Sequence, residues 1–316
     1  CVIDPDLSYE YYPDCLQNIN EGDCIPIEEE NDLFNCELGD VIINNEYYCL
    51  DDLNVLDDII DLNGISTSSS NIDDQDGDGL NDNQDDRFTA LELGHQVWEN
   101  GRLVSLSFMA SGIYESYGYH IPYLPESISD LVFLNYLNVS ETGLVSFPDS
   151  FGNLPSLDAL DAWRNELNDN SFPNSMNNLS LTGISLDGNY IQTFPNFIQY
   201  STPQLSYLYL GYGFWGTGNQ IEYLPDWWSY TEIPFLQLLD LSNNNLIELP
   251  EDINAYPFEL MLWNNHLTNI NADWSCDLIN SGSQIYIQDN FICENIPSCF
   301  NQEYVGNQKG CDISIN

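Results

Sequence analysis

One acidic stretch carries the side chains whose type and spacing best predict a chemical role. Residues Asp74 to Asp85 have the sequence DQDGDGLNDNQD, with carboxylates at the first, third, fifth, ninth and twelfth positions. Gly79 stands sixth, where a loop folded around one ion needs a sharp turn. Oxygen ligands at this alternation converge on one centre and suit a hard cation, so the stretch predicts a calcium site. Its expected ligands are Asp74, Asp76, Asp78, Leu80, Asp82 and Asp85.

This stretch resembles the calcium loops of EF-hand proteins and of thrombospondin type 3 repeats. The resemblance implies that Leu80 offers its backbone carbonyl and that Asp82 acts directly or through a water. The chain departs from the EF-hand pattern at Asp85, where those loops have a longer glutamate that binds through both oxygens. Chance is the competing interpretation, because the chain has 51 acidic residues. Bound calcium would have a structural role, since it would neutralise the loop and fix it against the first repeat.

The remaining reactive side chains form no recognisable catalytic motif. His95, His120 and His266 are scattered without metal-ligand spacing, and the sequence has no G-x-S-x-G, H-E-x-x-H or phosphate-binding glycine loop. A carboxylate pair such as Asp161 and Asp187 would suit a glycosidase, but paired acids are too common in this chain to be specific. The sequence therefore predicts a protein that is not an enzyme.

Charge limits the possible partners. Lys and Arg total 4, Asp and Glu total 51, and the formal net charge is −47. Such a chain cannot displace counterions from nucleic acid or anionic lipid, so both are excluded as partners. Its 43% of hydrophobic residues nevertheless predicts a folded protein. The screening length falls to about 3 Å near 1 M salt, so the composition indicates adaptation to seawater or brine, with a specific cationic ligand as the alternative.

A repeated sequence motif extends over most of the chain. Residues 236–250, LQLLDLSNNNLIELP, fit L-x-x-L-x-L-x-x-N-x-L followed by x-x-L-P. Further copies begin at Leu134, Leu157, Leu181 and Leu205, and weaker copies flank them. Each L-x-L predicts a short strand, and each Asn predicts a turn whose buried backbone groups are satisfied by its amide. The Asn position holds Asn165, Asn189, Asn219, Asn244, Asn265 and Asn290, with Ser111 and Thr142 in the first two turns.

The pattern resembles the leucine-rich repeat family over residues 103–292, or about eight turns. One turn cannot bury its own leucines, so the turns must stack. The resemblance implies an α/β-type solenoid with a concave parallel sheet and disulfide-stapled N- and C-terminal caps. It divides the chain into an acidic, cysteine-containing segment or cap (1–49), a capping helix with the calcium-loop linker (50–102), the repeats (103–292) and a C-terminal cap (293–316).

The segment before the repeats predicts a terminal helix. Residues 49–63, CLDDLNVLDDIIDLN, place apolar side chains at helical spacing. This helix is expected to cover the open first edge of the sheet. Together with LELGHQVWENGRLVSLSF, residues 91–108, it resembles the entry region of secreted leucine-rich repeat proteins of marine bacteria.

Eight of the nine cysteines form two groups, one at each end of the repeats. The groups are Cys15, Cys24, Cys36 and Cys49, and Cys276, Cys293, Cys299 and Cys311. They predict disulfides formed in an oxidising compartment, with zinc as an alternative that lacks C-x-x-C spacing. Cys276 and Cys299 fall at similar places in successive turns, which favours Cys276–Cys299 with Cys293–Cys311. The N-terminal pairing stays open among three connectivities.

The ninth cysteine, Cys1, resembles the lipidated first residue of a mature bacterial lipoprotein. The resemblance implies an outer-membrane lipoprotein at the bacterial cell surface, whose contact with the membrane is its lipid anchor. An intermolecular disulfide and an arbitrary first residue are the alternatives. Whether residues 1–49 form a tether or a folded cap stays open.

Strand positions that alternate with the buried leucines would line the concave face. Aromatic rings beside carboxylates and amides there suit a protein partner or a glycan. Insertions at residues 114–123 and 211–219 add aromatic side chains to the same surface. The expected contact residues are Tyr136, Asp161, Trp163, Asp187, Tyr207, Tyr209, Tyr212, Trp215, Asp240, Trp263 and Tyr286.

Together these features predict a non-catalytic extracellular recognition protein, anchored at the cell surface, that binds a protein or a glycan. The alternative is a structural subunit of a surface layer, a filament or an outer-membrane assembly, which would self-associate or bind an outer-membrane protein. Such a subunit would bury its N-terminal segment, or an aromatic patch such as Trp227 and Trp228, against another chain.

Overall fold

The computed structural model describes residues 36, 38–43, 46–65, 90–109, 119–211, 218–229, 231–253, 255 and 257–311. The predicted calcium stretch, Cys1, Cys15, Cys24, Tyr212 and Trp215 lie outside these residues. The chain divides into two compact units, one of residues 1–144 with 148–157 and one of residues 145–147 with 158–316.

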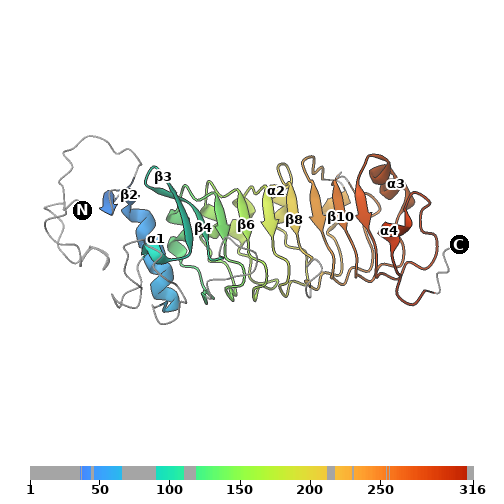
Figure 1. The fold of residues 1–316 in the computed structure, drawn as a ribbon, viewed down its shortest axis with the longest axis horizontal. Helices are drawn as coiled ribbons and strands as arrows, with labels where there is room; N and C mark the ends of the chain where they lie inside the picture. Colours follow the sequence, from blue (N-terminus) through green and yellow to red (C-terminus); the bar gives the residue numbers. More distant parts are fainter. Residues whose placement is uncertain are drawn as a thin grey trace. The chain divides into compact units, whose positions relative to one another are not determined.

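The first unit begins with a small hairpin and a helix. β1 (Asp40–Ile43) pairs antiparallel with β2 (Glu46–Cys49), and α1 (Leu50–Asn63) follows directly (Figure 1). The predicted helix is confirmed, and its apolar face from Leu50 to Ile60 is buried, whereas Leu62 is 49% exposed. Gly64 ends the helix in the left-handed region, with φ of 61°, which glycine adopts without strain.

The first sheet strands of this unit differ from the expected arrangement at their edge. β4 (Arg102–Ser107) pairs parallel with β5 (Tyr136–Asn138) on one side, and antiparallel with β3 (His95–Glu99) on the other. Asn100 and Gly101 form the turn between β3 and β4 with φ of 51° and 75°. An Asn-Gly pair favours this tight hairpin, so β3 takes the edge that helix α1 was expected to cover.

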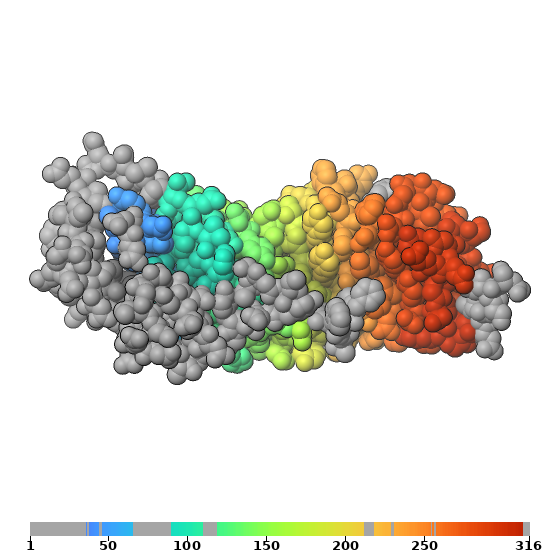
Figure 2. All heavy atoms as spheres, in the orientation of Figure 1, coloured from blue at the N-terminus to red at the C-terminus, as the bar shows by residue number. Residues whose placement is uncertain are grey.

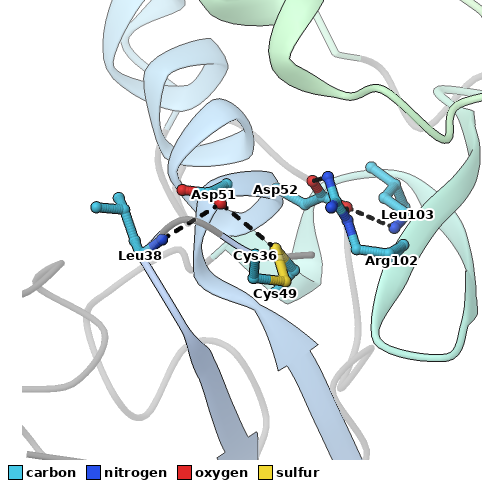
Figure 3. The surroundings of a disulfide bond; sticks show 7 residues. All are labelled: Cys36, Leu38, Cys49, Asp51, Asp52, Arg102 and Leu103. Atoms are coloured by element: carbon cyan, nitrogen blue, oxygen red, sulfur yellow. Dashed lines mark hydrogen bonds and ion pairs between the residues drawn. A yellow bond between two sulfur atoms is a disulfide. The ribbon is translucent and has the colours of Figure 1, made fainter. Parts of the chain in front are cut away.

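A buried ion pair ties α1 to β4 in the same unit (Figure 3). Arg102 donates from Nη2 to Asp52 Oδ1 at 2.7 Å and from Nε to Asp52 Oδ2 at 3.0 Å. The backbone N–H of Leu103 donates to the same carboxylate at 2.8 Å. The Arg102 guanidinium also lies 4.7 Å from the centre of the Phe133 ring. Asp52 therefore fixes the helix against the first strand of the repeats.

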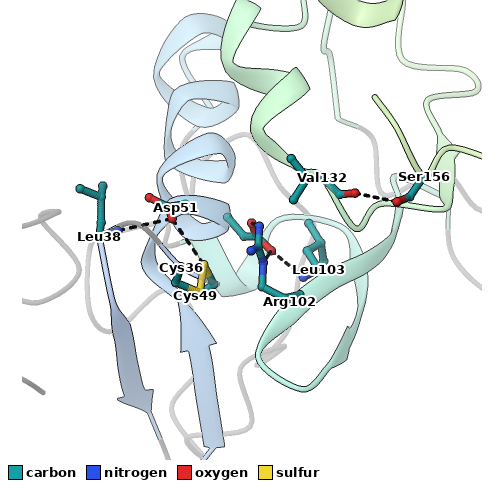
Figure 4. A network of polar contacts seen from close by, with 9 residues as sticks. Cys36, Leu38, Cys49, Asp51, Arg102, Leu103, Val132 and Ser156 are labelled. Carbon is teal, nitrogen blue, oxygen red and sulfur yellow. Dashed lines mark hydrogen bonds and ion pairs between the residues drawn. A yellow bond between two sulfur atoms is a disulfide. The ribbon is translucent and has the colours of Figure 1, made fainter. Parts of the chain in front are cut away.

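The hairpin and helix α1 form the N-terminal cap. Its disulfide joins Cys36, which precedes β1, to Cys49 at the end of β2. Asp51 lies beside it, where its Oδ2 accepts from the backbone N–H of Leu38 at 3.4 Å (Figure 3). A further bond in the unit, from Ser156 Oγ to the Val132 carbonyl at 2.7 Å, links two successive turns (Figure 4). The predicted N-terminal disulfide cap is thus present for the two cysteines that the structure describes.

The second unit is built on six parallel strands. They are hydrogen-bonded in chain order (Figure 1) and comprise β6 (Ala159–Asp161), β7 (Gly183–Ser185), β8 (Tyr207–Tyr209), β9 (Leu238–Asp240), β10 (Glu259–Met261) and β11 (Gln284–Tyr286). The central residue of each strand, Leu or Ile, is at most 1% exposed. With β4 and β5, these strands account for the eight predicted turns, so the parallel leucine-rich sheet is confirmed.

Short helices and packed aromatic rings form the return side of the second unit. The helices are a 3-10 turn at 174–178, α2 (Ile198–Ser201), a 3-10 turn at 226–229, α3 (Ala272–Asn280) and α4 (Gln302–Val305). Trp227 and Trp228 are only 6% and 0% exposed and pack against Phe194 with ring centres 5.8 and 5.5 Å apart. These two indoles are therefore not the aromatic patch that an assembly subunit would bury against another chain, because they already pack inside this unit.

The asparagine ladder predicted from the repeats is confirmed. Asn189 Oδ1 accepts from the N–H groups of Asn165 and Leu167 at 3.1 Å, and its Nδ2 donates to the carbonyls of Ala162 and Leu186 at 3.0 and 2.9 Å. Asn244, Asn265 and Asn290 repeat this double connection to their own turn and to the one before. Each amide thereby satisfies backbone groups that water does not reach.

The ladder ends in a glutamine that lies beyond the repeats. Gln308 Oε1 accepts from the N–H of Ile292 at 3.1 Å, and its Nε2 donates to the carbonyls of Ile287 and Val305 at 2.8 Å. The disulfides Cys276–Cys299 and Cys293–Cys311 hold this C-terminal cap together, which confirms the predicted pairing. The described atoms of the second unit form a continuously packed body up to this cap (Figure 2).

Candidate functional site

The outward side chains of strands β6 to β11 form one polar and aromatic surface, here called the strand face. Parallel pairing aligns Tyr209 with Ser185 on one side and with Asp240 on the other. The alternation of side chains along a strand turns these residues away from the buried leucines. The described predicted contact residues of this unit are Asp161, Trp163, Asp187, Tyr207, Tyr209, Asp240, Trp263 and Tyr286. Tyr136 belongs to β5 of the first unit, where it is half-buried.

Three aspartates lie close enough on the strand face to affect one another's charge. Burial raises the pKa of Asp187 to about 7, and the nearby carboxylates of Asp240 and Asp161 act in the same direction. The hydroxyl of Ser185 donates to Asp187 Oδ1 at 2.7 Å and acts against this rise. The face therefore carries a carboxyl group, that of Asp187, whose charge changes near neutral pH.

Asp240 is the most enclosed of the three aspartates. It is 4% exposed, and its Oδ1 accepts from the backbone N–H of Ser242 at 2.8 Å. A Cβ atom added at Gly211 would lie 2.3 Å from Asp240 Oδ1, so glycine is needed where the insertion begins. The Asp240 carbonyl accepts from the backbone N–H groups of Leu210 and Gly211 at 2.8 and 3.0 Å, so the residue holds the start of the insertion in place. Ser242, another outward position, is fully buried.

Tyrosines provide the contact area of the face. Tyr207 is 42% exposed, and its hydroxyl donates to Gln237 Oε1 at 2.9 Å. The Tyr286 hydroxyl donates to Gln284 Oε1 at 2.6 Å, and its ring meets Tyr304 edge to face with centres 5.1 Å apart. Burial, reinforced by the charge of Asp240, raises the pKa of Tyr209. The hydrogen bonds of Tyr207 and Tyr286 hold their rings in fixed positions, which favours recognition because little side-chain freedom is lost on binding.

Two tryptophans extend the face toward the turns. Trp163 and Trp263 are half-buried and follow β6 and β10. The Arg164 guanidinium lies 5.9 Å from the Trp163 ring centre, within cation–π range. Sequence reasoning placed Gln284 among the outward strand positions but missed Gln237 and Tyr304, which also contact the tyrosines. Gln284 was visible as an outward strand position, whereas Gln237 precedes β9 and Tyr304 lies in α4, outside the repeat pattern.

Metal chemistry has little support among the described residues. There, the one cluster with metal-ligand geometry is Cys36, Asp40 and Cys49, and the Cys36–Cys49 disulfide takes both sulfurs. The disulfides of the C-terminal cap likewise use the thiolates that zinc would need. Within the same described ranges, no helix is both long and apolar enough to span a bilayer.

Comparisons with known proteins bear on the fold. No protein-family model matches the chain, and no curated protein matches it. Among solved structures, the ectodomain of the membrane receptor kinase GASSHO1/SCHENGEN3 from Arabidopsis thaliana, in complex with CASPARIAN STRIP INTEGRITY FACTOR 2, is 18% identical. That match covers 77% of this chain and 30% of the receptor chain, with a TM-score of 0.50.

Two bacterial structures are also similar. A leucine-rich repeat protein of Leptospira interrogans is 19% identical over 54% of this chain and 53% of its own, with a TM-score of 0.37. An internalin of Listeria monocytogenes is 18% identical over 65% of this chain and 60% of its own, with a TM-score of 0.43. This chain thus spans between 30% and 60% of these three chains. The parallel L-x-L strands, the buried asparagine ladder and the likeness to the Arabidopsis ectodomain show that this chain has the leucine-rich repeat fold.

Proposed function

We propose that the chain is a non-catalytic extracellular recognition protein that binds a protein or peptide through the strand face of its second unit. The observation that carries this proposal is the juxtaposition of exposed Tyr207 with the fixed tyrosines and aspartates of neighbouring strands. Tyrosine is enriched at protein interfaces because it buries a large, rigid area and keeps one polar contact. The three disulfides support an oxidising, extracellular location.

Charge complementarity narrows the chemistry of the partner. Asp161, Asp187 and Glu259 surround the tyrosines on the face, in a chain of net charge −47. A partner segment with Lys or Arg beside apolar or aromatic residues would match this surface. The Arabidopsis receptor ectodomain was solved with a bound partner, CASPARIAN STRIP INTEGRITY FACTOR 2. At 18% identity that likeness concerns the fold. That the strand face of this chain also binds a partner is therefore part of the proposal.

A displayed peptide library would test this function. The library is selected on the wild-type chain in 0.5 M NaCl, and selected peptides are re-screened on Tyr207→Ala and on Tyr200→Ala. Tyr200 is a matched control, because it is 51% exposed and lies on α2 rather than on a sheet strand. We expect a family of basic peptides that the first variant loses and the second retains. Peptides that bind both variants equally would contradict the proposal, and an array of neutral glycans on the same chains tests the glycan alternative.

Surface anchoring through Cys1 and calcium binding at residues 74–85 stay proposals of the sequence. Intact mass of detergent-extracted native protein would show a lipid-sized excess on the Cys1 peptide. Removal of calcium by a chelator would lower the melting temperature, and Asp76→Asn would abolish that response. An unmodified Cys1, or identical melting with and without chelator, would contradict the respective proposal.

An exposed apolar pair favours the structural-subunit alternative. Phe235 and Phe258 are 61% and 59% exposed, and they border a pocket of about 440 Å³ with Pro234 and Gly282. Exposed apolar patches of this kind are typical of interaction surfaces. Sedimentation in high salt would distinguish the two functions. Oligomers that dissociate in Phe235→Ser would favour the assembly subunit, and a monomer at high concentration would favour recognition.

A further inference from the structure

A pocket opens in the second unit on the turns that follow the sheet strands. It has a volume of about 520 Å³, within the range of small-molecule sites. Its lining comprises Asn189, Tyr190, Gly218, Asn219, Gln220, Asn243, Asn244, Asn245, Asn264, His266 and Lys309. None of these residues belongs to the strand face, so the pocket is independent of the function proposed above.

The charge of this lining is opposite to that of the chain as a whole. The protein has 51 acidic residues among 316, yet none of the described residues that line the pocket is Asp or Glu. Lys309, one of only 4 Lys and Arg residues in the sequence, lies in it beside His266. Asp289, an exposed residue that follows β11, is not part of the lining. The pocket is therefore a place where an anion can contact a positive charge, in a protein whose surface is otherwise mostly negative.

Lys309 is held in position by the turns around it. Its Nζ donates to Asn264 Oδ1 at 2.6 Å, and Asn264 Nδ2 donates in turn to Asn243 Oδ1 at 2.5 Å. Asn264 and Asn243 have φ of 54° and 52°, in the left-handed region that asparagine tolerates. The ammonium also lies 5.7 Å from the centre of the Phe291 ring, which packs beside His266. An ammonium carries three donors, so Lys309 can bind a ligand while it keeps Asn264.

The other lining groups suit hydroxyls and a ring face. The amides of Gln220 and Asn245 each provide donors and an acceptor, as a sugar hydroxyl requires. Tyr190 is 51% exposed at the pocket wall, and its ring offers a flat apolar surface against which a pyranose can stack. Amides, an aromatic ring and one fixed cation are complementary to a sugar unit that bears an acid group.

We propose that this pocket binds an acidic saccharide, with the carboxylate or sulfate of one sugar unit on Lys309 and its hydroxyls on the amides of Gln220 and Asn245. Screening by salt reduces repulsion from the distant carboxylates, because the Debye length falls to about 3 Å at 1 M. The contact with Lys309 lies at hydrogen-bond distance and persists under the same conditions.

Calorimetric titration with defined disaccharides tests the proposal. A uronic-acid disaccharide and its neutral counterpart are titrated into the full chain in 0.5 M NaCl, with citrate as a non-sugar anion. We expect the acidic sugar to bind at least tenfold more tightly than the neutral one. Lys309→Gln, which removes the charge and keeps a polar side chain, should remove this preference, and Tyr190→Ala should weaken both sugars. Tyr200→Ala, equally exposed elsewhere, should change neither.

Three results would overturn the proposal. They are the absence of binding by either sugar at millimolar concentration, an acid preference that survives in Lys309→Gln, and equal weakening by Tyr200→Ala. Citrate binding as tight as that of the acidic sugar would make this a simple anion site and would contradict the saccharide assignment. Tyr207→Ala on the strand face should leave the titration unchanged, so failure here is distinguishable from failure of the proposed function. Equal melting temperatures of the variants would exclude misfolding as the cause.

Discussion

Asp187 is the side chain on the strand face whose surroundings most strongly alter its chemistry. Its carboxyl is half-buried beside Asp240 and Asp161, and Ser185 provides its one short side-chain hydrogen bond in the structure. Protonation near neutral pH relieves repulsion among the three acids. A cationic side chain of a partner would relieve the same repulsion, so under the proposed function we expect this residue to link the stability of the fold to recognition.

We expect the stability of the protein to fall as pH rises through this titration. The folded pKa of Asp187, about 7, lies above the usual value of 3.8. Between these values the folded chain keeps a proton that the unfolded chain has lost, so the free energy of unfolding declines with rising pH and levels off above about 7. Asp187→Asn should remove this contribution and be more stable than the wild type at pH 8 by about 1–2 kcal/mol. Urea denaturation measures both free energies of unfolding. If the wild type and Asp187→Asn showed the same change in unfolding free energy from pH 5 to 8, the assignment would be contradicted.

The ladder amides predict a second effect at single residues. Asn189→Ala removes an acceptor from two backbone N–H groups and a donor from two carbonyls, all of them buried. Each group left without a partner costs about 1–3 kcal/mol, so the variant should lose at least about 3 kcal/mol of unfolding free energy. Asn196→Ala, on an exposed side chain, serves as the control and should stay within about 0.5 kcal/mol. Similar losses in both variants would show that the ladder is not the source of stability.

At the scale of elements, the N-terminal cap depends on one buried ion pair. Burial raises the pKa of Asp52, and the hydrogen bonds from Arg102 and Leu103 act against that rise. Because both side chains are at most 4% exposed, loss of one partner leaves the other charge buried. The pair fixes α1 to β4 and specifies how the helix docks on the first repeat (Figure 3).

Single and double substitutions of this pair should therefore differ in a specific way. Arg102→Met should lower the free energy of unfolding by about 3–5 kcal/mol, since it leaves the buried Asp52 carboxylate without its counter-charge. The double variant Asp52→Leu with Arg102→Met should recover part of that loss, because no charge stays buried. Urea denaturation followed by tryptophan fluorescence measures both changes. A double variant whose loss equals the sum of the two single losses would contradict this account of the cap.

The sequence predicted the elements that depend on periodic patterns, and it missed those that depend on single contacts. The helix at 50–63 and the strands of the repeats follow from apolar spacing, and the C-terminal disulfides follow from the positions of Cys276 and Cys299 in successive turns. Gln308 completes the ladder from outside the repeat, so no periodicity could identify it. The hairpin of β3 and β4 had a signal, Asn100-Gly101, that the repeat pattern concealed.

Parts of the candidate site escaped prediction for a related reason. Strand alternation placed Tyr207 and Tyr209 on the outward side, but it could not show that Asp240 is enclosed by the start of the insertion. The pocket around Lys309 joins residues from four separate turns and a cap. Such a constellation exists only after the turns have stacked, and the sequence around Lys309 has no motif of its own.

At the scale of the whole molecule, the net charge of −47 opposes folding. Salt screens this repulsion over about 10 Å at 0.1 M and about 3 Å at 1 M. Calorimetry should therefore show a melting temperature at least about 5 °C higher in 1 M than in 0.05 M NaCl, which corresponds to about 3 kcal/mol for a chain of this size. Sucrose at equal osmolality is the control for general exclusion effects. An unchanged or lower melting temperature in salt would contradict the view that the charge is a cost of folding.

The central claim, recognition through the strand face, is tested most directly by the affinity of one selected basic peptide for three chains. The peptide is titrated calorimetrically into the wild type, Tyr207→Ala and Tyr200→Ala, in the same buffer at 0.5 M NaCl. We predict at least a tenfold loss of affinity for Tyr207→Ala and none for Tyr200→Ala. Equal affinity for all three chains, or a loss confined to Tyr200→Ala, would place recognition elsewhere on the molecule and contradict the account.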